Sequence, residues 1–251
     1  MDEKAVSETM AYMMILGVVL FLISIVYVQV YNTTVDNAEK FKIISMRESF
    51  RKIYDVFVLS LYGGASLQQI QLELQGGAFY VTRNATMDIE LFNDKGELID
   101  SHSFNLYSLN YEIGDFRISF ENGALLEDYY DHRRFVQQPS IYLRSVQSPR
   151  ASGEMETILV LVLNKIDSDV SVAGSGPIVM VFNSSMTLSR MYPTTGKVNL
   201  TVTSDYSELW ANYFKDLGGS VFQSGNRVFV EITFNKIVLT VYTTNVTIKK
   251  F

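Results

Sequence analysis

Two histidines, His102 and His132, are the obvious candidates for metal binding, but they lie far apart in the chain. Zinc sites combine histidine, cysteine and carboxylate ligands at short, characteristic spacings. Neither histidine has a second ligand at such a spacing, so the sequence predicts no metal site. The chain has no cysteine, which excludes zinc-thiolate sites, iron–sulfur clusters and thiol catalysis.

Acidic, basic and phenolic side chains gather between Asp128 and Arg134, in the order Asp-Tyr-Tyr-Asp-His-Arg-Arg. These residue types serve acid–base catalysis or ligand binding, but they are also typical of a charged loop between strands, which is the interpretation we favour. The Gly174-Ser175-Gly176-Pro177 segment lacks the lysine and the following helix of a phosphate loop. We therefore expect no catalytic residue, no cofactor and no enzymatic activity.

The composition indicates a folded domain. Of the 251 residues, 47% are hydrophobic, which is enough for a packed core, and the net charge is −6. A mildly acidic chain is a poor match for nucleic acid, so we expect no nucleic-acid partner.

The element that dominates the sequence is the uncharged segment from Met10 to Tyr31. As a helix it would be roughly 33 Å long, close to the ~30 Å hydrocarbon thickness of a bilayer. Four interpretations compete: a buried core helix, a cleaved secretory signal, a signal anchor, and a retained stretch behind a short leader. A buried core helix is rarely this long without a charged residue, which disfavours the first interpretation. The lack of small residues around Gln29-Val30-Tyr31-Asn32 disfavours the second.

The leader, residues 1–5, ends in a basic residue followed by a small one, and the apolar helix begins almost at once. This layout resembles the class III signal of archaeal type IV pilin-like proteins, which a prepilin peptidase cuts after a basic-small pair. The resemblance implies processing at Lys4, Ala5 and Val6, with Val6 as the new amino terminus. Bacterial pilins carry a glutamate at the fifth mature position, whereas Glu8 would be third, so we interpret Glu8 as a charge favourable to the helix dipole.

The helix is predicted to continue to residue 62, giving one element over residues 6–62 that is roughly 85 Å long. Its second half repeats large apolar residues at alternating spacings of three and four, which places them on one seam. These helix-packing residues are Ile43, Met46, Phe50, Ile53 and Phe57. The seam favours docking onto the protein's own sheet over an intersubunit coiled coil. Gly17 and Ser24 share another face, where small residues would allow close helix approach.

Residues 65–251 have the period of two that is typical of strands, with turn signals such as Glu121-Asn122-Gly123. We predict ten to twelve strands in an antiparallel sandwich or two packed sheets. The apolar run Met155 to Leu163 predicts a strand buried on both faces. One helix is expected over residues 205–217, with Ser204 as its N-cap and Trp210 as a core plug.

The fold class is therefore α+β: a long N-terminal, pilin-like α-helix followed by a mainly antiparallel β-sandwich-type domain with one short inserted helix. The charge bias around the apolar segment would place this domain inside the cell, because basic residues follow the segment and only Lys4 precedes it. Long domains cross membranes largely regardless of charge, so we expect an extracellular domain. Five sequons agree with that side and are candidates for N-glycosylation: Asn32, Asn84, Asn183, Asn199 and Asn245.

The order of leader, long helix, Glu121–Ala124 turn and the Thr201–Phe214 block resembles a largely uncharacterised family of archaeal pilin-like surface proteins. The resemblance implies envelope location and pilin-type export, and it carries no catalytic residues over. We expect a structural or adhesive subunit of a surface filament or pseudo-filament, in contact with the membrane and with like or related subunits through its N-terminal helix. The alternative is a monomeric, membrane-anchored surface domain with a binding or stator-like role.

Overall fold

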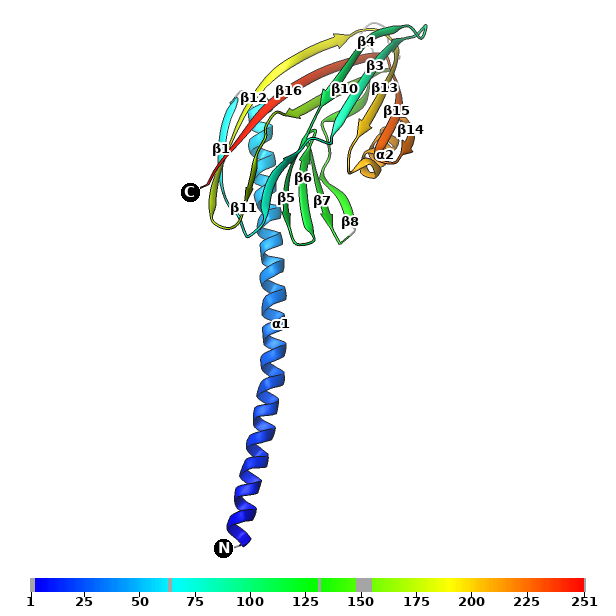
Figure 1. The fold of residues 1–251 in the computed structure, drawn as a ribbon. Coiled ribbons are helices and arrows are strands. Elements are labelled where there is room, and N and C mark those ends of the chain that lie inside the picture. Colours follow the sequence, from blue (N-terminus) through cyan, green and yellow to red (C-terminus); the bar gives the residue numbers. More distant parts are fainter. Residues whose placement is uncertain (1–2, 63–64, 131, 148–154, 251) are drawn as a thin grey trace. The chain divides into compact units, whose positions relative to one another are not determined.

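The computed structural model describes residues 3–62, 65–130, 132–147 and 155–250 of the chain. These described residues form two helices and sixteen strands, and the strands make three sheets (Figure 1). The chain divides into two compact units, residues 1–46 and residues 47–251. The predicted fold class, a long N-terminal helix followed by a mostly antiparallel β-rich domain with one short helix, is confirmed.

Helix α1 runs without a break from Glu3 to Tyr62, close to the predicted range. In the first unit, every side chain that is described between Met10 and Val35 is exposed. The hydroxyls of this part bond back to the helix itself: Ser24 donates to the Leu20 carbonyl at 2.8 Å and Thr33 to the Gln29 carbonyl at 2.9 Å. A polar side chain satisfied in this way needs no water, which suits a helix in an apolar medium.

The first sheet has the strand order β1-β12-β16-β10-β9. Its strands are β1 (Leu67–Glu73), β12 (Pro177–Tyr192), β16 (Lys236–Lys250), β10 (Met155–Ile166) and β9 (Ile141–Gln147). The β10–β16 pair is parallel, and the other pairs described in the three sheets are antiparallel.

The second sheet has the order β11-β2-β5-β6-β7-β8. Its strands are β11 (Ser171–Ala173), β2 (Ala78–Thr82), β5 (Ser108–Ile113), β6 (Phe116–Glu121), β7 (Ala124–Tyr129) and β8 (His132–Gln137). The turn between β6 and β7 is the predicted one, and Asn122 and Gly123 both have positive φ, 47° and 75°. Asparagine followed by glycine is the usual pair for such a hairpin turn.

The third sheet has the order β14-β15-β13-β3-β4. Its strands are β14 (Ser220–Ser224), β15 (Arg227–Phe234), β13 (Gly196–Thr203), β3 (Thr86–Asn93) and β4 (Leu98–Asn105). The predicted count of ten to twelve strands was therefore wrong. Strands such as β4, β8 and β14 carry few large apolar residues, so alternation in the sequence does not reveal them.

The apolar run of β10 is buried on one face, whereas the sequence predicted burial on both. Leu159, Leu161 and Leu163 are fully buried, while Ile158, Val160 and Val162 are half-buried. Neighbouring strands on either side satisfy the backbone of β10, and this is why it is central in the sheet. The described part of the chain leaves its second face only partly covered.

The last turns of α1, which belong to the second unit, dock onto the sheets. Phe50 stacks on Phe79 of β2 with ring centroids 5.4 Å apart, and Phe57 contacts Phe120 of β6 at 4.3 Å. Phe50, Ile53 and Phe57 are all at most 1% exposed. This is the docking that the spacing of the seam indicates. Ile43 and Met46 lie in the first unit, so their packing stays a prediction.

Helix α2 (Ser207–Asp216) lies beside β14 and β15 (Figure 1) and belongs to a second core, to which all three sheets contribute residues. Trp210 is fully buried there, with its ring 5.8 Å from Phe135 and 6.2 Å from Tyr213. This is the core position that the sequence indicates for the single tryptophan.

Ser204 is not the N-cap of α2, in contrast to the prediction. The helix begins at Ser207, and Tyr206 holds the N-cap position without a side-chain hydrogen bond. The Ser204 hydroxyl accepts instead from the Tyr206 backbone N–H at 3.0 Å and donates to Glu121. A local turn and a distant acceptor therefore replace the capping bond.

We predict that Phe57→Ala lowers the free energy of unfolding of the β-rich domain by about 3–5 kcal/mol, the usual range for an aromatic side chain removed from a packed core. Urea denaturation of the full chain, followed by Trp210 fluorescence, measures this. The control is Leu59→Ala, because Leu59 is on the same helix and 53% exposed. Equal losses in the two variants would contradict the docking of this helix face.

Candidate functional site

The predicted processing residues Lys4, Ala5 and Val6 lie in helical backbone at the start of α1, but their side chains fall outside the described residues. Residues 1–2 of the predicted leader are likewise outside. Cleavage between Ala5 and Val6 therefore stays a prediction.

The helix-packing residues Gly17 and Ser24 lie on the exposed part of α1. A Cβ atom added to Gly17 would meet nothing within 4 Å in the described chain. The chain itself gives no steric reason for a glycine here. By length and composition, α1 from Met10 onward could cross a membrane, and none of its most apolar stretch is buried in the structure.

The five sequons occupy different surroundings. Asn32 is exposed on α1, and Asn183 and Asn245 are exposed cross-strand partners on β12 and β16. Asn84 is half-buried and donates to Asp205 at 2.5 Å. Asn199 is half-buried in β13, between β3 and β15. Exposure therefore favours Asn32, Asn183 and Asn245 as acceptors.

A buried carboxylate joins two segments that are far apart in the chain. Glu121, at the end of β6, is 2% exposed and accepts three hydrogen bonds of 2.7 Å. The donors are the Ser108 hydroxyl on β5, the Ser204 hydroxyl before α2 and the Trp210 indole N–H on α2. The Glu121 turn and the Thr201–Phe214 block, which the sequence singled out separately, therefore meet at one side chain.

Burial raises the pKa of Glu121 above its ordinary value of 4.5, because desolvation penalises the carboxylate more than the three donors favour it. No cation bonds to this carboxyl among the described residues. An acid without a basic partner in a core is costly when ionised, so the folded state holds this proton more tightly than the unfolded chain does.

A second layer of polar contacts lies next to Glu121 on the same face of the second sheet. The Ser119 hydroxyl donates to the Asn110 side-chain carbonyl at 2.6 Å and also lies 2.7 Å from the Tyr206 hydroxyl. The Asn110 amide in turn donates to the Thr82 hydroxyl at 3.0 Å. Strands β2, β5 and β6 are thereby tied to the segment that leads into α2.

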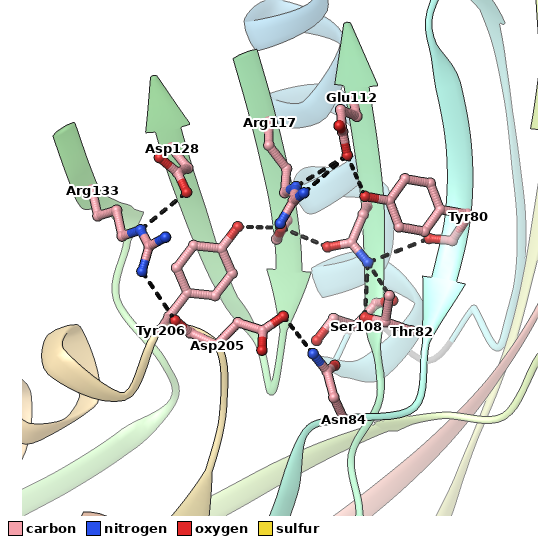
Figure 2. A network of polar contacts seen from close by, with 12 residues as sticks. Tyr80, Thr82, Asn84, Ser108, Glu112, Arg117, Asp128, Arg133, Asp205 and Tyr206 are labelled. Atoms are coloured by element: carbon pink, nitrogen blue, oxygen red, sulfur yellow. Dashed lines mark hydrogen bonds and ion pairs between the residues drawn. The ribbon is translucent and has the colours of Figure 1, made fainter. Parts of the chain in front are cut away.

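Two acid–base pairs complete the network towards the surface (Figure 2). Arg117 donates to Glu112 at 3.0 Å, and Arg133 donates to Asp128 at 3.0 Å. Tyr80 donates to Glu112 at 2.5 Å, and this bond, together with Arg117, lowers the pKa of Glu112. Burial, and the bond to Glu112, raise the pKa of Tyr80 to about 12.

The segment from Asp128 to Arg134 forms the ends of β7 and β8 and the turn between them, of which Asp131 lies outside the described residues. His132 is exposed there, while His102 lies on β4, 3.2 Å from Asp100. Among the residues that the structure describes, no group of three or more histidine or acidic side chains could hold a metal ion.

The comparisons with known proteins give a family. Residues 4–249 match a family described as a family of unknown function, DUF7289. The chain belongs to the DUF7289 family. It is also similar to an uncharacterized protein of Archaeoglobus fulgidus, with 25% identity over 220 residues that cover 72% of this chain and 71% of the relative. No solved structure matches the chain.

The sequence did not predict the polar network of this DUF7289 member, and the local pattern of β6 suggests the opposite of what the structure has. Strand β6 alternates Phe116, Ile118 and Phe120 with polar residues, a pattern that indicates a solvated second face. Ser119 and Glu121 are nevertheless buried, because the segment around Tyr206 and Trp210 covers them. The donors belong to a part of the chain far along the sequence, so spacing cannot reveal them.

We predict that Glu121→Ala lowers the free energy of unfolding by about 3 kcal/mol or more, because three buried donors lose their acceptor. Glu121→Gln should lose much less, since an amide resembles the protonated acid. Between the ordinary pKa and the raised one, only the folded state holds the proton, so the stability of the natural chain falls as pH rises through this window.

Urea unfolding followed by Trp210 fluorescence between pH 4.5 and pH 7 tests this prediction. The natural chain should lose more stability over this range than Glu121→Gln. The exposed Glu90→Gln substitution serves as the control and should follow the natural chain. Parallel pH profiles for all three proteins would contradict the raised pKa.

Proposed function

We propose that this chain is a pilin-like subunit of an archaeal cell-surface filament or pseudo-filament. Its N-terminal helix rests in the membrane before assembly and packs with the helices of like or related subunits afterwards. The β-rich domain lies outside the cell and has a structural or adhesive role. The observation that carries this proposal is the uncharged surface of α1 between Met10 and Tyr31, which the described chain leaves exposed.

Lipid and neighbouring helices are interchangeable surroundings for such a helix. Both remove apolar side chains from water, and both require that the backbone and hydroxyl groups have hydrogen-bond partners other than water. Ser24, Thr33 and Thr34 meet that requirement by donating to carbonyls one turn earlier. Gly17 and Ser24 add small positions at which a second helix could approach closely.

Three further observations support the proposal. The leader layout at Lys4, Ala5 and Val6 resembles a class III signal, and a relative of 25% identity comes from an archaeon. The exposed sequons Asn183 and Asn245 are compatible with a domain outside the cell.

Single-cysteine cross-linking tests the assembly, because the natural chain contains no cysteine. We predict that Gly17→Cys and Ser24→Cys form disulfide-linked dimers on oxidation of native membranes or filaments. Val19→Cys and Val26→Cys are the matched controls, since each lies about 200° around the helix from its test position. They should cross-link several-fold less.

Mass spectrometry of the native amino terminus, on the same preparation, distinguishes a processed pilin-like subunit from a monomeric membrane anchor. A mature chain that begins at Val6 is the expected result for a pilin-like subunit. An uncleaved leader together with no cross-linking at any of the four positions would contradict the proposal and indicate a monomeric anchor.

A further inference from the structure

A polar hollow lies at one end of the second sheet, lined by residues of the β5–β6 turn and by described residues at the adjoining ends of β7 and β8. It has a volume of about 460 Å³, and the lining side chains that matter here are Glu112, Asp115, Arg117, Asp128, Tyr130 and Arg133. The hollow lies wholly in the second unit, and the membrane helix contributes nothing to its lining.

Each acid–base pair at the hollow has hydrogen-bonding atoms to which no described residue bonds. Tyr80 and Arg117 both bond to the same oxygen of Glu112, Oε2, and Arg133 bonds to Oδ2 of Asp128. No described residue bonds to Glu112 Oε1 or Asp128 Oδ1, nor to Nη1 of Arg117 or Nη2 of Arg133. Two acceptors and two donor groups are therefore left on planar side chains.

The charges at the hollow nearly cancel. The hollow contains two guanidinium groups and the carboxylates of Glu112, Asp128 and Asp115. The first two carboxylates form ion pairs with the guanidinium groups. The carboxylates would repel an anion and the guanidinium groups would repel a cation. Neither kind of ion would therefore gain much electrostatic binding energy at the hollow. A hydroxyl both donates and accepts, and it matches alternating acceptors and donors without bringing a charge.

The aromatic ring of Tyr130 also lines the hollow. Tyr130 is 59% exposed, and its φ is 47°, in the left-handed region that tyrosine rarely adopts. Such a conformation is unfavourable for tyrosine, and residues of this kind cluster at ligand-binding positions. Glycine would fit the backbone better. The Tyr130 ring contacts the Tyr129 ring, with centroids 4.4 Å apart, and the rest of its surface is open to a ligand.

From these observations we propose that the hollow is a binding site for a neutral carbohydrate. The apolar face of a pyranose ring packs against Tyr130, and its hydroxyls bond to the unused atoms of Glu112, Arg117, Asp128 and Arg133. The network behind the hollow holds these groups in place: Tyr80 fixes Glu112, and the Asp205 carbonyl accepts from Arg133 at 3.3 Å. Figure 2 shows both pairs against this network. Fixed groups lose little freedom on binding.

Ligand-observed saturation-transfer NMR tests the site on the full-length chain in phosphatidylcholine nanodiscs, which contain no sugar headgroup. The probes are mannotriose, cellotriose, galactotriose and chitotriose, each at 5 mM, with polygalacturonate trimer as the anionic counterpart. We expect transfer to at least one neutral trisaccharide and none to the anionic one.

Tyr130→Gly is the decisive variant, because glycine suits the backbone there and the fold should be retained or stabilised. It should weaken binding at least tenfold, and Arg117→Lys should weaken it as well. Tyr142→Gly is the control, since Tyr142 is a 41% exposed tyrosine on β9 outside this hollow. Transfer to none of the neutral probes, preference for the anionic probe, or unchanged binding by Tyr130→Gly would each overturn the proposal.

Discussion

The uncharged helix surface between Met10 and Tyr31 is the constraint on which the rest of this molecule depends. Burying one large apolar side chain contributes about 1.5–3 kcal/mol, so more than a dozen such residues amount to tens of kcal/mol. A folded domain is stable by only about 5–15 kcal/mol. Lipid or other helices would supply that free energy by covering the helix surface, and this gain is the physical basis of the proposed membrane anchoring and assembly.

From Arg47 onward, helix α1 is part of the core of the β-rich domain. Phe50 and Phe57 pack on the apolar face of the second sheet, and the Arg47 guanidinium binds the buried Glu127 of β7 through two bonds, of 2.6 and 2.9 Å. One face of the second sheet thus holds the helix. The other face holds the segment leading into α2 through Glu121. A single sheet thereby links the helix to the second core of the domain.

Much of this architecture follows from local sequence. The absence of charge and of proline predicts the long helix, and the alternation around Asn122-Gly123 predicts a hairpin, because both patterns act over a few residues. The polar strands β4, β8 and β14 escape prediction because their partners, rather than their own residues, determine their pairing. The half-buried second face of β10 and the role of Ser204, which does not cap α2, were predicted wrongly for the same reason. What covers a residue is decided by distant parts of the chain, and Glu121 is the clearest case.

The most direct measurement of the central claim is lysine labelling of intact cells with a membrane-impermeant reagent, followed by mass spectrometry. Lys95, Lys215 and Lys249 are exposed on the β-rich domain and report its side of the membrane. If α1 anchors the domain outside the cell, all three are labelled without lysis, and the chain sediments with membranes or filaments. Labelling of these lysines only after lysis, with the chain in the soluble fraction, would contradict the account.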